Sequence, residues 1–397
     1  MVELLAPAGD RLKLDTAVYF GADAVYFGGG FSLRSYCKNF SDAELKDALD
    51  FLHSQNKKGY IAVNIFPRDA DFEKLKDNLI YLQSIKADAV IMSDPGLIDL
   101  CKKVAPKLKI HLSTQANTLN KYSAKFWSDY VDRIILAREL SIEEISEIKN
   151  YVPKLSLEAF VHGAMCISYS GRCLLSNYLS NRDANKGECV QACRWEYQIK
   201  EVSRTAENYL TILEDDKASY ILNSKDLCLI GHLDKLKNAG IDSFKIEGRM
   251  KSEYYVATVV NAYKKAILNK FAPTEELAAE LYKTGHRQFT TAYNFGENKD
   301  TVAYDTSKPA QSYDYVGFIL GYENGYIKLV QKNRFYRGDT LEVLSPGNNF
   351  NRQIKIDEIK DEKGQEVPDA KIVEQILFIK SDIKLSKNDI LRKKRQN

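Results

Sequence analysis

Four of the seven cysteines in this 397-residue chain lie close together, with the spacing C-x6-C-x15-C-x3-C. They are Cys166, Cys173, Cys189 and Cys193. Thiolates are soft ligands, and four of them suit an iron–sulfur cluster or a structural zinc ion. Two disulfides or buried thiols are the alternative interpretation. The other three cysteines are scattered singly and are typical of core or loop thiols. The spacing therefore predicts a metal site held by four cysteines.

A second set of candidates consists of polar side chains that follow short apolar runs. The rigid donor fork of arginine matches a carboxylate, so Arg34, Arg138 and Arg249 are candidates for anion recognition. A structural ion pair is the alternative for each arginine. His162 is a candidate acid or base, or a hydrogen-bond donor to the ligands of the metal site, with a satisfied structural histidine as the alternative. The remaining candidates are neutral or acidic: Asn64, Gln115, Asn117 and Glu247.

Composition and motifs exclude several classes of protein. Apolar residues make up 44% of the chain and charged residues 28%, which is ordinary for a soluble globular protein. No apolar run approaches the roughly 20 residues of a membrane span. The segment Met1–Pro7 lacks a basic leader, so we expect cytoplasmic residence, where reduced thiols favour a metal over disulfides. Neither the G-x-S-x-G elbow nor the H-E-x-x-H zinc helix of hydrolases occurs.

The elements that must position these residues alternate between strand and helix. Eight apolar runs are predicted strands: Glu3–Pro7, Ala24–Phe27, Gly59–Ile65, Ala89–Met92, Lys109–Leu112, Arg133–Leu136, Lys154–Phe160 and Ser243–Ile246. Predicted helices between or after them include Asp42–His53 (N-cap Ser41), Asp71–Ile85, Ile142–Lys149, Leu227–Asn238 and Glu253–Leu268. Eight such alternations favour the α/β class and a TIM-type (β/α)8 barrel, with an open doubly wound sheet as the alternative.

The clustered cysteines lie in an insertion, about residues 163–226, that follows the seventh predicted strand. Insertions after barrel strands lie on the C-terminal face, where barrel active sites are built. Polar residues at the strand ends point to the same mouth. We therefore expect the metal site beside the active mouth. The insertion also contains a candidate hairpin, Tyr197–Val202 with Tyr209–Leu213.

Beyond the barrel, assigned to residues 1–297, the pattern changes. Residues 298–312 are polar and are predicted to be a linker. Short strands separated by glycine turns at 313–383 predict a small antiparallel β-barrel domain. Residues 384–397 form a basic tail, either a solvated terminus or a contact for phosphates. Lys332, Arg334 and Arg337 gather on one candidate turn and are further candidates for such a contact.

The cysteine stretch also resembles a known family. The run Glu158-x-Phe160-x-x-Gly163-Ala-Met-Cys166-x4-Gly171-x-Cys173-x-Leu175-Ser176 is similar to the characteristic pattern of peptidase family U32, named for collagenase-like proteins. Within that family the chain resembles the branch of prephenate-dependent tRNA uridine-34 hydroxylation proteins. The similarity extends from Leu4 to the C-terminal domain.

The resemblance implies an RNA-modifying enzyme. It implies oxygen-independent hydroxylation of the wobble uridine in the tRNA anticodon stem-loop to 5-hydroxyuridine, with prephenate as co-substrate. It further implies a [4Fe-4S] cluster on the four clustered cysteines, with zinc in aerobic preparations. We expect His162, Glu247 and Arg249 to be catalytic. The expected substrate-binding residues are Arg34, Asn64, Gln115, Asn117, Arg138 and Arg249.

Three other functions remain open from the sequence. A sister branch of the family implies hydroxylation of a cytidine in 23S ribosomal RNA. The name of the family implies a peptidase that acts on collagen-like substrates. The fourth possibility is a non-catalytic iron–sulfur partner of another hydroxylase.

Overall fold

The fold was determined as a computed structural model. It describes residues 2–32, 39–166, 168–169, 173, 175–180, 182, 189–195, 223–296, 301–303 and 309–395. Arg34, most of the predicted linker and both strands of the candidate hairpin in the insertion lie outside these residues. All four clustered cysteines lie within them.

Eight parallel strands close into a barrel. They are β1 (Glu3–Pro7), β2 (Ala24–Gly28), β3 (Lys58–Ala62), β4 (Ala89–Met92), β5 (Lys109–Leu112), β6 (Arg133–Ile135), β7 (Ser156–Ala164) and β9 (Ser243–Ile246). Neighbours in chain order pair from β1 to β7, and β9 pairs with both β1 and β7. The TIM-type barrel predicted from the sequence is thereby confirmed.

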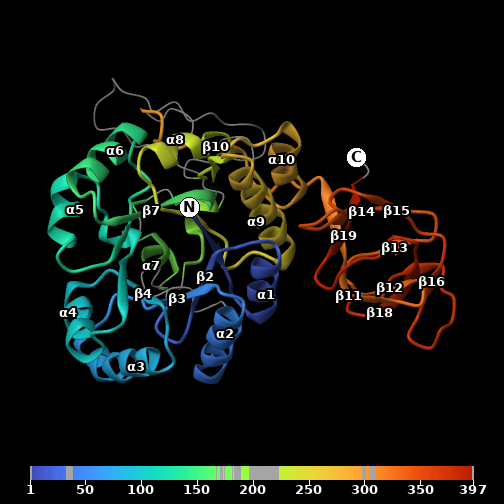
Figure 1. Ribbon diagram of the computed structural model, residues 1–397, viewed down its shortest axis with the longest axis horizontal. Coiled ribbons are helices and arrows are strands. Elements are labelled where there is room, and N and C mark those ends of the chain that lie inside the picture. Colours follow the sequence, from blue (N-terminus) through green and yellow to red (C-terminus); the bar gives the residue numbers. More distant parts are fainter. Residues whose placement is uncertain are drawn as a thin grey trace. The chain divides into compact units, whose positions relative to one another are not determined.

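The helices between the strands follow the predicted pattern. They are α2 (Asp42–Ser54), α3 (Phe72–Ser84), α4 (Pro95–Val104), α5 (Lys121–Trp127), α6 (Ile142–Tyr151) and α8 (Leu233–Asn238). Figure 1 shows α2 to α6 around the outside of the strands. Ser41 caps α2 as predicted, because its side chain accepts from the Glu44 amide and Glu44 reaches back to the Ser41 backbone. No described helix combines the length and the apolar character that a membrane span requires.

The predicted helix Leu227–Asn238 begins too early. The seventh strand continues past Phe160 to Ala164 and offers an extra edge, with which β8 (Asp226–Cys228) pairs antiparallel. A short strand, β10 (Phe289–Thr290), pairs with β8 in turn. The first residues of the predicted helix are therefore extended, and α8 begins at Leu233. In the insertion, a short helix α7 (Leu175–Ser180) is described.

Side chains from six strands meet inside the barrel. The cluster consists of Leu5, Ala24, Tyr26, Tyr60, Ala89, Ile91 and Ile135, with Phe160 packed against it. Residues on the inner face of a strand recur every second position. The cluster therefore fixes which residues at the strand ends continue the inner face of the barrel.

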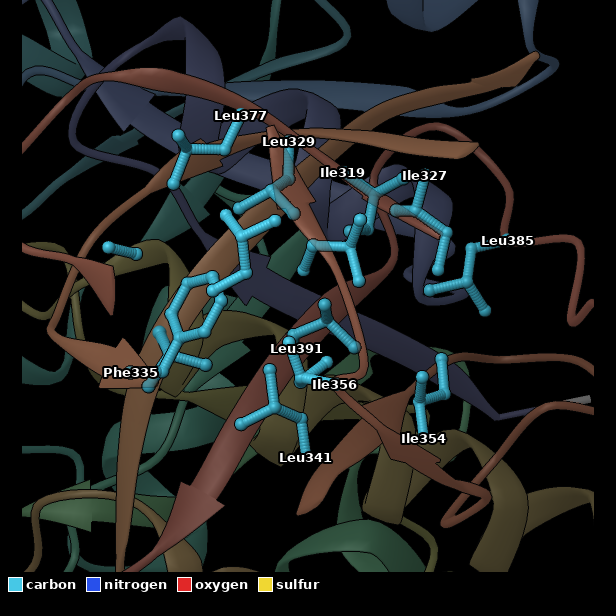
Figure 2. Packing of buried hydrophobic residues seen from close by; sticks show 14 of the residues in the cluster. Ile319, Ile327, Leu329, Phe335, Leu341, Ile354, Ile356, Leu377, Leu385 and Leu391 are labelled. Carbon is cyan, nitrogen blue, oxygen red and sulfur yellow. The ribbon is translucent and has the colours of Figure 1, made fainter. Parts of the chain in front are cut away.

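The C-terminal strands form a separate half-barrel. They are β11 (Tyr313–Glu323), β12 (Tyr326–Gln331), β14 (Thr340–Leu344), β15 (Gln353–Lys355), β16 (Ile359–Lys360), β18 (Ile376–Lys380) and β19 (Ile390–Lys394). The antiparallel order is β15-β14-β19-β11-β12-β18-β16, and β13 (Phe335–Tyr336) pairs separately with β17 (Asp369–Ala370). Figure 2 shows the buried side chains between these strands, among them Ile319, Leu329 and Leu391.

The predicted basic tail is wrong for residues 390–394. These residues form β19, which lies in the middle of the sheet between β11 and β14. Ile390, Leu391 and Arg392 are all fully buried. The tail prediction failed because the many basic residues of this segment suggested exposure, although Ile390, Leu391 and Arg392 are buried.

Packing divides the chain into two compact units. One holds residues 1–11, 23–250 and 287–309, and the other holds 12–22, 251–286 and 310–397. The second unit therefore includes α1 (Arg11–Tyr19, apart from its first residue), α9 (Glu253–Leu268) and α10 (Glu275–Glu280) together with the half-barrel. This division differs from the predicted boundary at residue 298, because α9 and α10 group with the C-terminal strands.

Candidate functional site

The C-terminal ends of β3, β4 and β5 present a layer of small polar residues. Val63 donates to the Ile91 carbonyl (2.9 Å) and Ser113 donates to the Met92 carbonyl (2.8 Å), so the parallel ladder continues past the strands. This register places Asn64, Ser93 and Ser113 side by side. They follow Ala62, Ile91 and His111 by two residues, and Ile91 belongs to the inner cluster. The three polar side chains therefore continue the inner face into the mouth.

Gln115 folds back over this layer from the 3-10 turn Thr114–Ala116. Its Oε1 accepts from Asn64 Nδ2 (2.8 Å) and from Ser113 Oγ (3.1 Å), and the residue is only 4% exposed. Asn117 ends the turn in the left-handed conformation, with φ of 52°, and its Nδ2 donates to the Gln115 carbonyl. The structure thus brings together three of the predicted binding residues, Asn64, Gln115 and Asn117.

Some buried polar atoms near these strand ends find no hydrogen-bond partner among the described residues. They are Ser93 Oγ, Gln115 Nε2, Thr118 Oγ1 and Glu139 Oε2. Buried polar groups in native proteins are nearly always satisfied, so several exceptions at neighbouring strand ends call for an explanation, and a bound ligand that completes them is one. The strand ends of β4, β5 and β6 therefore have the chemistry of a binding site.

Arg249 lies buried on the opposite arc of the barrel, just after β9. It is 5% exposed, and its Nη2 donates to Ser32 Oγ (3.1 Å) and Asn39 Oδ1 (2.8 Å). A side chain at Gly28 would come within 2.6 Å of the same Nη2, so the end of β2 must be glycine to admit the guanidinium. Arg249 is thus held by residues that lie about two hundred positions away in the sequence.

Glu247, just after β9, is positioned by Tyr26 of β2, which lies on the far side of β1. The Tyr26 hydroxyl donates to Glu247 Oε2 (3.0 Å) and to the Ile246 carbonyl (3.0 Å). Tyr26 belongs to the inner cluster, so the carboxylate of Glu247 lies on the inner face. Gly163 (φ of +112°) approaches closely, because a Cβ at that position would lie 2.5 Å from the Glu247 carbonyl oxygen.

Arg138 follows β6 and contacts the end of β7. Its Nη1 donates to the Ala164 carbonyl (3.3 Å), and its guanidinium lies 5.8 Å from the centre of the Phe160 ring. Phe160 packs against the inner cluster. Arg138 therefore lies at the mouth, as predicted, on the β6–β7 side.

His162 has a different setting from that predicted. The register between β7 and β9 shifts between Phe160 and His162, so that His162 pairs with Ile246 rather than with an inner-face residue. The imidazole is 1% exposed, and its ring centre lies 5.4 Å from that of Phe289. Across the β7–β8 ladder His162 lies opposite Cys228, a residue that sequence reasoning left among the scattered thiols.

No disulfide joins the four clustered cysteines to one another. Cys166 and Cys189 are exposed, whereas Cys173 and Cys193 are half-buried. The Ser176 hydroxyl of α7 lies 3.8 Å from Cys189 Sγ and accepts from the Val190 amide. The residue types fit an iron–sulfur cluster or zinc. Within the described part of the chain, no group of three or more His, Cys, Asp or Glu side chains is arranged to hold a metal ion, so the ligand set stays a prediction.

A charged network fills the N-terminal end of the barrel. Glu158, with no exposure, pairs with Lys245 (3.0 Å) and Arg133 (3.0 Å), and Arg133 also reaches Glu3 (2.6 Å). Burial, and then the charge of Arg133, holds the pKa of His111 well below its usual value. Ion pairs at this end of a barrel stabilise the fold, whereas the chemistry of such barrels takes place at the opposite end. Arg133 and Lys245 are therefore engaged in this network, away from the mouth, where Arg138 and Arg249 lie.

The predicted basic turn of the half-barrel is balanced by acidic residues. Each cation has a carboxylate neighbour: Lys332 with Glu374 (2.7 Å), Arg334 with Asp369, and Arg337 with Glu366 (3.9 Å). Pairing of this kind weakens the attraction for phosphates, because each contact would compete with a carboxylate. The turn is therefore a weaker candidate for RNA binding than its sequence suggests.

The sequence of this chain matches the models of known protein families. The model of peptidase family U32 matches residues 9–303, and the model of the family's C-terminal domain matches residues 311–392. The chain belongs to peptidase family U32. The U32 match spans the barrel from β2 to β9, the cysteine stretch and both arginines of the mouth.

Individual relatives in this family carry different names. A Bacillus subtilis relative named tRNA hydroxylation protein P1 is 39% identical, and the alignment spans 98% of this chain and 94% of that protein. An Escherichia coli relative named 23S rRNA 5-hydroxycytidine synthase is 31% identical over 86% of this chain and 52% of that protein. A Porphyromonas gingivalis relative named collagenase is 30% identical over 91% and 90%.

Several site residues were not predicted from the sequence. The predicted binding residues did not include Ser93, Tyr26, Ser32 or Asn39. The signal for Ser93 was available, because it follows the alternation of Ala89 and Ile91. The partners of Arg249 and Glu247 carried no local signal, since they are brought near only by closure of the barrel.

Proposed function

We propose that this protein is an RNA-modifying enzyme that hydroxylates the wobble uridine of tRNA to 5-hydroxyuridine, with prephenate as co-substrate. The observation that carries the proposal is the barrel mouth, which combines a neutral polar layer with two arginines beside the cysteine stretch. The 39% identity to a tRNA hydroxylation protein over nearly the whole chain supports the same reading.

The two sides of the mouth suit two different ligands. Prephenate carries two carboxylates, and guanidinium groups bind carboxylates through paired charge-assisted hydrogen bonds. Arg249 and Arg138 supply such groups on the β9 and β6 sides. A uracil ring is neutral and offers carbonyl oxygens and an N–H, which suit the amide and hydroxyl groups of Gln115 and Ser93.

The chemistry requires a co-reactant. Replacing the C5–H of uracil by C5–OH adds one oxygen atom and removes two electrons from the base. Residues of the chain can bind both ligands and exclude water, and Glu247 can hold or move a proton at its Oε2, where the Tyr26 hydroxyl donates. Cys166, Cys173, Cys189 and Cys193 would hold the proposed [4Fe-4S] cluster, which supplies electron transfer or structural support when bound.

One alternative keeps the chemistry and changes the RNA. The 31% identity to a 23S rRNA 5-hydroxycytidine synthase favours a cytidine of ribosomal RNA as the second candidate substrate. The fold and the four cysteines would serve both reactions. The base presented to the mouth therefore decides between them.

Nucleoside profiling of RNA from a deletion strain tests the proposal. We expect 5-hydroxyuridine to disappear from tRNA and to return with the wild-type gene, while 5-hydroxycytidine in 23S rRNA stays unchanged. Loss of the cytidine product alone would establish the alternative. Unchanged levels of both nucleosides would contradict RNA hydroxylation, and assays on collagen peptides would then test the peptidase reading.

Metal analysis of anaerobically purified protein tests the cluster. We expect four iron and four sulfide per chain, counts that a [4Fe-4S] cluster requires. Cys173→Ser should lose the iron, whereas Cys101→Ala, which changes a buried thiol outside the stretch, should keep it. Stoichiometric zinc without iron would refute the iron–sulfur assignment.

A further inference from the structure

We infer that Ser93 and Gln115 form the subsite that reads the ring of the RNA base, apart from the arginines that take the anionic co-substrate. The inference rests on the proposed function and goes beyond it by naming the groups that select a pyrimidine. Both residues lie at the C-terminal ends of neighbouring strands, β4 and β5.

The position of the two residues follows from the register. Asn64, Ser93 and Ser113 lie side by side at the ends of β3, β4 and β5, on the inner face. Gln115 is fixed over them, because its Oε1 accepts from both Asn64 and Ser113. Since the oxygen of the amide is engaged twice, the orientation of its nitrogen is set. Nε2 therefore stands as a preorganised donor in the mouth.

Two atoms of this layer are buried without a hydrogen-bond partner in the described ranges. They are Ser93 Oγ and Gln115 Nε2, and the residues are 8% and 4% exposed. A buried donor left unsatisfied destabilises a fold, so such atoms persist where a ligand completes them. A pair of them at adjacent strand ends marks a place where a ligand with matching groups binds.

The chemistry of the pair selects a neutral ligand edge. Gln115 Nε2 only donates, and the Ser93 hydroxyl both donates and accepts. On the O4–N3 edge, uracil presents a carbonyl acceptor next to an N3–H donor, so Nε2 can donate to O4 while Ser93 Oγ accepts from N3–H. Cytosine presents an amino donor and an N3 acceptor at the same positions. The amino group of cytosine would meet the donor of Gln115, and the pair therefore favours uracil.

The substitution Gln115→Glu separates recognition from structure. Glutamate keeps an oxygen that accepts from Asn64 Nδ2 and Ser113 Oγ, but it replaces the donor by an acceptor. With purified protein and two RNA hairpins that differ only in U or C at the target position, we expect kcat/KM for the U hairpin to fall about 10- to 100-fold. The preference for U over C should fall by a similar factor.

Ser93→Ala provides a second variant that does not endanger the fold. Its hydroxyl has no described hydrogen-bond partner to lose, so the melting temperature should stay the same or rise. We nevertheless expect kcat/KM for the U hairpin to fall about 5- to 10-fold, through the loss of one hydrogen bond. Thr114→Ala is the control, because it removes an ordinary hydrogen bond to the Leu136 carbonyl (3.0 Å) from a hydroxyl at the end of the neighbouring strand, β5.

The outcomes separate the inference from the proposed function. If Gln115→Glu and Ser93→Ala keep the wild-type kcat/KM and the wild-type preference for U, the base-reading subsite is refuted while RNA hydroxylation stands. If the wild-type protein modifies neither hairpin nor whole tRNA, both fall. Should Gln115→Glu fail to fold, Ser93→Ala alone decides, since a purely structural serine would leave activity at the level of Thr114→Ala.

Discussion

Arg392 tests whether the end of the chain is a solvated tail or a structural strand. Its side chain is completely buried in β19, where Nε donates to Glu342 Oε1 (2.8 Å) and Nη2 donates to Glu280 Oε2 (2.7 Å). Arg392→Met keeps the apolar stem and removes the charge. Among the described residues, Lys283 is then the cation that still pairs with both carboxylates, 2.5 Å from Glu280 and 2.7 Å from Glu342.

The expected loss is large because two carboxylates would stay buried. Removing one partner of a buried ion pair typically destabilises by about 3–5 kcal/mol. Arg395→Met is the matched control, only three residues further on. The side chain of Arg395 is 47% exposed and pairs with Asp314 at 2.7 Å. An exposed pair of this kind contributes roughly 0–1 kcal/mol, so this variant should resemble the wild type.

Hydrogen exchange followed by mass spectrometry measures the effect in the half-barrel itself. A loss of about 3–5 kcal/mol corresponds to a fall of roughly 10²- to 10⁴-fold in the protection of amides that exchange by opening of this unit. We expect it in peptides from β11, β14 and β19 of Arg392→Met, and not of Arg395→Met. Equal protection in both variants would refute the buried network and restore the solvated tail.

Three further predictions concern the barrel. Gly163→Ala should lower the urea midpoint of unfolding strongly, because φ is +112° and the added Cβ would lie 2.5 Å from the Glu247 carbonyl oxygen. Gly231→Ala is the control and should keep the wild-type midpoint, because no atom lies within 4 Å of its added Cβ. Burial lowers the pKa of His111, so below about pH 6.5 the unfolded chain binds a proton that the folded chain does not bind, and the free energy of unfolding should fall by up to about 1.4 kcal/mol per pH unit. In His111→Asn, the free energy of unfolding measured with urea should depend less on pH between about pH 5 and 7. An equal pH dependence in the variant and the wild type would contradict the assignment. Burial raises the pKa of the Cys101 thiol to about 12, so iodoacetamide at pH 8 should modify it only in denaturant, and rapid labelling of folded protein would contradict its burial.

Much of the barrel was predictable because its strands are buried on both faces. Such strands appear as continuous apolar runs, and β1, β4, β5 and β9 begin and end at the predicted residues. Helix α9 was predicted with its full length, since Ser252 caps its start and its apolar positions continue without a break. Local signals of this kind require no knowledge of distant partners.

The failures all depend on partners far away in the sequence. Strand β8 exists only because β7 continues to Ala164 and offers an edge, which no local pattern in Asp226–Cys228 reveals. The buried arginine of β19 depends on Glu280, more than one hundred positions earlier. Arg249 lies just after β9, as its place in the sequence predicts, but its contacts with Ser32 and Asn39 follow only from closure of the barrel.

The difference between Glu247 and His162 shows why strand ends alone do not define a site. Both residues were predicted to follow the end of a strand, and both were predicted to be catalytic. Glu247 continues the inner alternation of Ser243 and Lys245, and its carboxylate meets Tyr26 of the inner cluster. The register shift before His162 breaks that alternation and sets the imidazole against Phe289. A proton transfer at the mouth is therefore better served by Glu247, and a variant of His162 that alters activity would act through the β7–β8 edge.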